Sequence, residues 1–389
     1  MSEFLAYGTL LGTASACVAV GSFASLHTPI KTRELRKNAG LDENLDEEEG
    51  QSQSLSSGNA YMFPIIGSAV LFSMYLAFKY LDKKMINMLL NFYFAMAGAF
   101  AIPTVLEHLV KVVRGGTSLP QLDRMLLRLH IPYPTWKSQR NVAPPITNAS
   151  KPINMPSNHI TIDLLGFLIM GTYLYTRSWL LTDFVAVCFA IQGIIIITLD
   201  TFQTGFILLA GLFFYDIFWV FGSAKLVKGG PSVMVSVATN FDGPIKILFP
   251  KNLLEVYKAW SWSASVPKLA FALLGLGDIV IPGVFVALAL RFDQMHASKT
   301  SPGLHFTRFF LKFPKPYFTA CLTAYVGGLL TTITVMHVFG AAQPALLYLS
   351  PACAISVLIV ALQRGELSEL WSWVDHTTEP SPVEKAKTT

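Results

Sequence analysis

Nine apolar stretches, each close to the length of a membrane-spanning helix, follow one another along this chain of 389 residues. A helix needs about 20 apolar residues to cross a hydrocarbon core of roughly 30 Å. Within a bilayer only helices and closed barrels satisfy every backbone polar group, and apolar runs of this length indicate helices. The expected spans are approximately residues 4–26, 61–80, 85–106, 159–176, 180–199, 202–223, 269–290, 317–338 and 342–362.

The composition agrees with a membrane protein, because 52% of the residues are hydrophobic and only 14% are charged. A net charge of +5 could indicate nucleic-acid binding in a soluble protein. Here the basic residues fall in loops between apolar stretches, where they set orientation, so no nucleic-acid partner is expected. The expected fold class is an all-α polytopic membrane protein with nine transmembrane helices. Four cysteines inside apolar stretches are expected to be buried hydrophobic residues, namely Cys17, Cys188, Cys321 and Cys353.

The first stretch resembles a retained span more than a cleaved signal sequence. No basic residue precedes it, and its apolar run exceeds the signal-peptide core of about 7 to 15 residues. Positive charges follow it instead, so the amino terminus is expected to face the lumen or exterior. With nine spans the carboxyl terminus is then cytosolic. The lysines between residues 225 and 268 do not fit this topology, but long loops translocate largely regardless of charge.

This topology predicts the organisation of the chain. Residues 40–58 are acidic and rich in Ser and Gly, which predicts a mobile linker. Residues 119–129 have helical spacing of Leu and Met, typical either of a helix on the membrane surface or of one that caps the bundle. Asn148 starts a glycosylation sequon that would face the cytosol, and we expect it to be unmodified. The predicted segments are a first span at 1–26, a cytosolic linker at 27–60, spans two to five at 61–200 with a cytosolic loop at 107–158, a catalytic half with spans six to nine at 201–362, and a cytosolic tail at 363–389.

Five aspartates lie within or beside the apolar stretches. Asp163, Asp183 and Asp200 are close to span ends, where the interface or a neighbouring cation can satisfy them, so a structural role is expected. Asp216 and Asp278 differ because apolar residues flank them on both sides. No Lys, Arg or His lies in the core of either span, so each carboxyl group is expected to need the other.

Two carboxyl groups within hydrogen-bond distance in a low dielectric cannot both ionise, so the pair is expected to share one proton near neutral pH. An aspartic protease uses this state. The ionised member acts as general base on a water molecule, while the protonated member polarises the scissile carbonyl and later protonates the leaving nitrogen. Such chemistry requires no metal, no cofactor and no nucleophilic Ser or Cys.

Three short motifs occur in a fixed order on three late spans: YD at Tyr215–Asp216, GLGD at 275–278 and QPALLY at 343–348. Together they resemble the intramembrane aspartyl proteases, the superfamily of presenilin and signal peptide peptidase. The resemblance extends over residues 60 to 365. Flanking segments, SVATNFDGPIKILFP at 236–250 and QPALLYLSPAC at 343–353, are more similar to signal peptide peptidase than to presenilin.

The resemblance implies a presenilin-like bundle in which Asp216 and Asp278 form the catalytic dyad, without a metal or another cofactor. It also implies a third motif, Pro344 to Leu346, that packs beside the dyad. Residues expected to support the active site or bind substrate are Tyr215, Gly275, Leu276, Gly277, Gln343, Pro344, Ala345 and Leu346.

The neighbours of the dyad also suit a protease on physical grounds. Gly275 and Gly277 weaken a helix and let another backbone approach, although they would equally suit tight helix packing. Pro344 disrupts helix geometry or, alternatively, marks the first position of the ninth span. A substrate helix must be unwound into an extended strand before cleavage. The segment 229–250, with its β-rich sequence SVMVSVATNF, is expected to form a strand or lid between spans six and seven, or else a surface hairpin.

The tail KAKTT places Lys385 and Lys387 at the spacing of a dilysine retrieval signal, which favours the endoplasmic reticulum. The resemblance then implies an endopeptidase that cleaves remnant signal peptides and type II oriented membrane anchors within the bilayer. Its substrates would be signal peptides and transmembrane helices, and it would contact lipid. A homo-oligomer and partners from degradation machinery are possible further partners. Two alternatives stay open from the residues alone: a proton-coupled transporter, in which the Asp pair relays protons, and a catalytically silent chaperone for membrane helices.

Overall fold

The computed structural model describes residues 2–27, 38, 53–55, 57–113, 160–176, 178–223, 232–241, 243–251, 271–300, 313–339 and 343–375. The predictions for the helix at 119–129, for Asn148 and for the tail lysines Lys385 and Lys387 lie outside these residues. All four cysteines are free and buried, as predicted.

Every predicted span contains a helix. Eight of the described helices are long and apolar enough to cross a membrane. The remaining one, α6, is apolar but has 17 residues, close to the lower limit of about 17 for a transmembrane helix. The helices are α1 (Ser2–Ala24), α3 (Ser57–Tyr80), α4 (Lys83–Val113), α6 (Ile160–Thr176), α7 (Trp179–Ile196), α8 (Phe202–Ile217) with its π-helical continuation η1 (Phe218–Gly222), α12 (Gly277–Thr300), α13 (Pro316–Phe339) and α14 (Leu346–Arg364).

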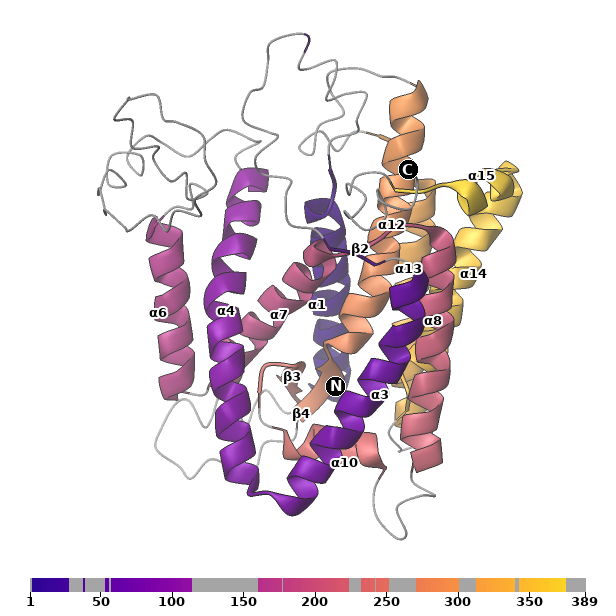
Figure 1. Ribbon diagram of the computed structural model, residues 1–389. Coiled ribbons are helices and arrows are strands. Elements are labelled where there is room, and N and C mark those ends of the chain that lie inside the picture. Colours follow the sequence, from indigo (N-terminus) through magenta and orange to yellow (C-terminus); the bar gives the residue numbers. More distant parts are fainter. Residues whose placement is uncertain are drawn as a thin grey trace, which may run out of the picture.

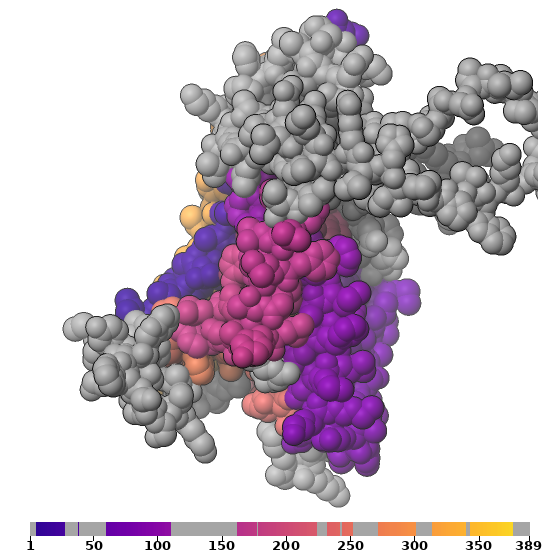
Figure 2. Space-filling model, turned by 90° about the vertical axis from the view of Figure 1, so that its left-hand side faces the viewer, coloured from indigo at the N-terminus to yellow at the C-terminus, as the bar shows by residue number. Residues whose placement is uncertain are grey.

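Helix α12 occupies the centre of the bundle (Figure 1). It contacts α1, α7, α8, α13 and α14. At the edge, α6 packs against α4, and a space-filling view from that side shows it on the outer face beside the indigo-to-purple helices (Figure 2). Residues of α12 are buried over most of its length, whereas α3 and α4 keep many large apolar side chains exposed, as expected for lipid-facing helices.

Small residues let α7 and α8 approach α12 closely. A Cβ atom added at Gly205 of α8 would lie 2.7 Å from the ring of Phe285 on α12. One added at Gly283 of α12 would lie 2.6 Å from Ile194 on α7. Both distances are far shorter than a normal van der Waals contact, so glycine sets the separation of these helices, as small residues commonly do in membrane bundles.

Two small sheets lie at the helix ends. Strand β1 (Gln53–Leu55) pairs in parallel with β2 (Ile197–Leu199), which follows α7 directly. This part of the segment predicted as a mobile linker is therefore a strand. Strand β3 (Lys246–Pro250) pairs antiparallel with β4 (Phe271–Gly275), with Lys246 opposite Gly275. The prediction of β structure between spans six and seven is confirmed by β3, which lies within the expected segment 229–250, whereas β4 falls at the start of the predicted seventh span.

The β-rich sequence in residues 232–241 forms a helix, α10 (Val233–Asn240). Ser232 caps this helix, because its side chain accepts a hydrogen bond from the Val235 N–H. Val233 and Val237 are buried one turn apart, and Val237 packs with Phe78 and Phe241. Tertiary packing thus overrides the strand preference of Val and Thr.

The segment after the last span returns to the bundle. Gly365, with φ of 69°, ends α14, and the short helix α15 (Leu367–Ser372) follows. The Asp375 N–H then donates to the Asp200 carbonyl oxygen over 2.7 Å. The Asp375 carboxylate lies 2.7 Å from the Arg291 guanidinium of α12, and both side chains are buried.

Candidate active site

Asp216 lies in the last turn of α8, just before the π-helical turn η1, and its side chain is buried. One carboxylate oxygen, Oδ2, accepts a hydrogen bond of 3.0 Å from the Leu346 N–H. Leu346 is the first residue of α14, where backbone N–H groups have no partner within the helix. The start of span nine therefore orients the Asp216 carboxyl group.

Asp278 lies in the first turn of α12, directly after strand β4. The prediction that 269–290 is one continuous helix is therefore wrong for its first residues. Gly275 and Gly277 disfavour helix at this point, and pairing with β3 keeps residues 271–275 extended. The Asp278 side chain is half-buried at this junction of strand and helix.

The fold brings the two aspartates together. Helices α8 and α12 are in contact, and the Asp278 carboxyl group is close enough to Asp216 to interact electrostatically with it. None of the ion pairs between described residues involves either aspartate. The two carboxyl groups thus interact within an apolar bundle, and no cation is paired to either in the part of the chain that the structure describes.

The GLGD motif connects the β3–β4 hairpin to the dyad. The Leu276 N–H donates to the Ile245 carbonyl oxygen over 2.9 Å, which continues the pairing of the two strands up to the helix start. A Cβ atom added at Gly275 would meet only the Asp278 Oδ2 atom, at 3.4 Å, among the described residues. A Cβ atom added at Gly277 would meet only the Ile281 side chain among the described residues, at 4.0 Å. The described chain itself makes no close backbone approach here, contrary to the helix-packing alternative.

The QPAL motif lies at the start of α14. Pro344, Ala345 and Leu346 are buried, and Gln343 is half-buried. Pro344 precedes the helix by two positions, so the alternative that it occupies the first helical position is wrong. Its carbonyl oxygen accepts a hydrogen bond of 3.3 Å from the Leu347 N–H.

Tyr215 packs against α3. A Cβ atom at Gly67 of α3 would lie 3.6 Å from the Tyr215 ring, and the Trp219 ring is 6.4 Å from it. Trp219 in turn donates its indole N–H to the Ser68 hydroxyl group over 3.0 Å. The YD motif therefore combines one residue that packs α8 against α3 with one, Asp216, that interacts electrostatically with Asp278.

Comparison with known proteins places the chain in a family. The family model described as signal peptide peptidase matches residues 47–377, which include all three motifs. The chain belongs to the signal peptide peptidase family. Human signal peptide peptidase is 33% identical over 98% of this chain and 87% of its own length. Intramembrane protease 2 of Caenorhabditis elegans is 42% identical over 56% of this chain and 44% of its own length. A probable intramembrane protease of Schizosaccharomyces pombe is 32% identical over 88% and 92%, respectively.

Membership in the signal peptide peptidase family confirms two predictions. The chain is a polytopic helical membrane protein, and it is an intramembrane aspartyl protease, because the family consists of aspartic intramembrane peptidases. The transporter and silent-chaperone alternatives are not favoured.

Sequence reasoning did not predict two contacts in the elements around the aspartate pair, although it expected a structural role for one of the residues, Asp183. Asp183 on α7 accepts a hydrogen bond of 2.8 Å from the Leu248 N–H of β3, instead of pairing with the membrane interface or a cation. Tyr325 on α13 is fully buried and donates its hydroxyl group to the Asp278 carbonyl oxygen over 3.4 Å. Neither contact leaves a signal in local sequence, because each joins residues that are far apart in the chain.

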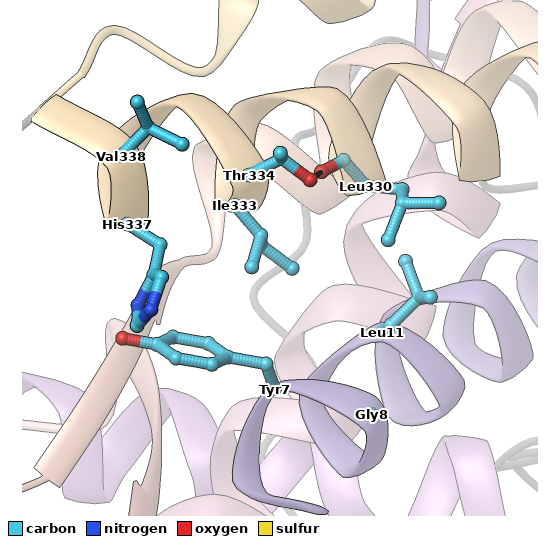
Figure 3. A pocket seen from close by; sticks show the side chains of 8 residues that line it. All are labelled: Tyr7, Gly8, Leu11, Leu330, Ile333, Thr334, His337 and Val338. Atoms are coloured by element: carbon cyan, nitrogen blue, oxygen red, sulfur yellow. Dashed lines mark hydrogen bonds between the residues drawn. The ribbon is translucent and has the colours of Figure 1, made fainter. Parts of the chain in front are cut away.

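A pocket of about 230 Å³ lies elsewhere, between α1 and α13 (Figure 3). Tyr7 and His337 lie beside each other at one end of it. Neither dyad aspartate lines it, so we do not assign it to the protease site. The lining residues are Tyr7, Gly8, Leu11, Leu330, Ile333, Thr334, His337 and Val338.

Proposed function

We propose that Asp216 and Asp278 are the catalytic dyad of this protease, and that it cleaves remnant signal peptides and type II oriented membrane anchors in the endoplasmic reticulum. The observation that carries the proposal is the meeting of the two aspartates from α8 and α12 beside the N-terminus of α14. The names of the relatives support it: signal peptide peptidase indicates the substrate class, and intramembrane protease indicates cleavage within the bilayer.

The two carboxyl groups are proposed to have different roles. Asp216 accepts the Leu346 N–H at the positive end of a helix, an environment that stabilises negative charge. Asp216 is therefore the general base that takes a proton from the attacking water. Asp278 carries the shared proton and donates a hydrogen bond to the scissile carbonyl oxygen. The proton that the leaving nitrogen needs is then supplied by the pair.

The β3–β4 hairpin is proposed to hold the substrate in an extended form. Because Ile245 and Leu276 form a hydrogen-bonded pair and such pairs alternate, the N–H groups of Leu273 and Gly275 point away from β3. The outer edge of β3 is occupied at Leu248 by Asp183. The outer edge of β4 leads directly to Asp278, and an unwound substrate segment can pair there by main-chain hydrogen bonds.

Tyr215, Gly275, Leu276, Gly277 and Gln343 are proposed to support this site together with the motif from Pro344 to Leu346. The half-open space beside the two glycines is where a substrate backbone would pass Asp278. A homo-oligomer and partners from degradation machinery are compatible with the proposal.

The decisive experiment uses purified full-length protein and a labelled signal peptide, with and without a transition-state analogue that carries a hydroxyl group in place of the attacked carbonyl. We expect cleavage within the apolar part of the peptide and full inhibition by the analogue. Binding of the peptide without any cleavage would contradict the proposal and favour a chaperone.

The proposed orientation has a lumenal amino terminus and a cytosolic carboxyl terminus with a retrieval signal. A glycosylation acceptor added before residue 4 should be modified, while Asn148 should carry no glycan. Replacing Lys385 and Lys387 by serine should let part of the protein reach the Golgi without changing its cleavage activity. A glycan on native Asn148 would overturn the topology.

A further inference from the structure

The helix that carries Asp278 has a defect directly at the dyad. In an α-helix the carbonyl group of residue 278 accepts a hydrogen bond from the N–H of the residue four positions later. That residue is Pro282, which lies inside α12 and has no N–H. The hydrogen bonds before this point are regular, since the Val280 N–H donates to the Leu276 carbonyl oxygen over 2.8 Å. The carbonyl group of the proposed catalytic residue is thus the first without a partner in its own helix.

Tyr325 supplies the missing donor. Its side chain is fully buried between α13 and α12, and its hydroxyl group lies 3.4 Å from the Asp278 carbonyl oxygen. The same hydroxyl group is near enough to the Asp278 carboxyl group to interact electrostatically with it. Because the ring is enclosed on all sides, the position of the hydroxyl group is fixed by packing.

This arrangement distinguishes Pro282 from the other prolines inside spanning helices. Pro64, Pro103 and Pro351 also remove an N–H from α3, α4 and α14. None of the three carbonyl groups that they leave free receives a side-chain hydrogen bond among the described residues, whereas that of Asp278 does. A side-chain donor is therefore present at the one proline-disrupted turn that holds a dyad residue.

We propose that Tyr325 is a positioning residue for Asp278: its hydroxyl group replaces the helix hydrogen bond that Pro282 removes and so fixes the first turn of α12. The inference rests on the proposed catalytic role of Asp278. An unsatisfied carbonyl group is costly inside a bilayer, and a first turn that lacks this hydrogen bond would let the Asp278 carboxyl group move relative to Asp216. Pro282 thus creates a mobile turn, and Tyr325 restores one defined position for it.

Tyr325→Phe tests the inference, with Tyr317→Phe as its matched control. Tyr317 lies on the same helix, is as deeply buried, and donates its hydroxyl group over 2.8 Å to Glu366, away from the dyad. We expect Tyr325→Phe to lower kcat about five- to twenty-fold with little change in KM, as for loss of one buried hydrogen bond that positions a reacting group. Tyr317→Phe should leave kcat unchanged. A Tyr325→Phe enzyme with wild-type kcat would overturn the inference.

Pro282→Ala then separates positioning from general packing, because alanine restores an N–H for the Asp278 carbonyl group. In the Pro282→Ala background the Tyr325→Phe change should have little further effect. Wild type, Tyr325→Phe, Pro282→Ala and the double variant are also compared by their affinity for the transition-state analogue. This affinity reports on the dyad even if Pro282→Ala turns over slowly. An equal loss of analogue affinity from Tyr325→Phe in both backgrounds would refute a role through the carbonyl group. Asp278→Asn protein is measured alongside them, and peptide cleavage by that variant would instead refute the proposed function.

Discussion

Helices α3 and α12 are both long and apolar enough to cross a membrane, but α12 is surrounded by protein and α3 is largely exposed. In the most apolar stretch of α12, 78% of the residues are buried inside the protein, against 6% for α3. The buried helix is nevertheless the less apolar of the two. It carries Arg291, Asp293 and Gln294 in its buried part, whereas α3 exposes Tyr61, Ile65 and Ile66.

The difference shows how burial works in a bilayer. Lipid is as apolar as leucine, so hydropathy does not drive a helix to the interior, and polar and small residues gather there instead. Two buried ionisable groups of α12 have partners of the usual kind: Arg291 pairs with Asp375, and Asp293 accepts hydrogen bonds from the Tyr317 and Phe318 N–H groups at the start of α13. Asp278 differs from them, since the charged group that it interacts with is another carboxyl group, that of Asp216.

The largest effect is expected from the dyad itself. Replacing Asp216 or Asp278 by asparagine keeps the shape of the side chain but removes the proton site, so either change should lower cleavage by roughly a thousand-fold or more. Because the two groups act as one unit, the double substitution should be no worse than either single one. Peptide cleavage by purified protein measures this. Substantial activity of Asp278→Asn protein would end the assignment of the dyad.

Expression level and helix content should stay near wild type in these variants. A matched substitution, Asp293→Asn, changes another buried aspartate of α12 that has only structural partners. It should affect stability more than the chemical step. If Asp293→Asn abolished kcat as thoroughly as Asp278→Asn, burial alone would explain the loss.

The second prediction concerns the open edge of β4. Leu273 is 56% exposed and its N–H points away from β3, so proline at this position removes a potential bond to substrate without breaking the pairing of the hairpin. Leu273→Pro should lower the rate of peptide cleavage about ten-fold, because it removes one main-chain hydrogen bond from the proposed pairing with substrate. Leu273→Ala keeps the N–H and should stay close to wild type. Equal losses in both variants would indicate a side-chain contact.

The sequence predicted the parts of this site that local pattern can encode. Asp216 and Asp278 are conspicuous because a carboxyl group in an apolar span is costly, and the three motifs identify their neighbours. It did not predict that residues 271–275 are extended, because FALLG is equally apolar as the start of a helix. The partner strand, the Asp183 contact with Leu248 and the Tyr325 contact with Asp278 depend on how distant segments pack.

The third prediction tests the buried ion pair at the other end of α12. Asp375→Ala would leave Arg291 buried without its counter-ion, which typically costs about 3–5 kcal/mol of stability. The temperature of half-inactivation in detergent should fall clearly. Ile66→Ala on lipid-facing α3 should change it little. The double variant Arg291→Met, Asp375→Leu should recover much of the loss, because it removes both charges; no recovery would point to a role of the charges beyond pairing.

The smallest effect is expected from adding a single methyl group. The change in stability should have opposite signs at a buried glycine and at one on an exposed helix face. At Gly205 an added Cβ atom meets the Phe285 ring at 2.7 Å, and that ring is itself held between Phe202 and Phe206, with centroids at 5.9 Å and 5.5 Å. Gly205→Ala should therefore cost about 1–3 kcal/mol by overpacking. At Gly171 of α6 nothing lies within 4 Å, so alanine there should be neutral or slightly stabilising through its better helix propensity. Thermal inactivation of both variants in detergent gives the comparison. Two losses of the same size would mean that the outer face of α6 is covered by protein, and that the division between buried and lipid-facing helices drawn from α12 and α3 does not extend to it.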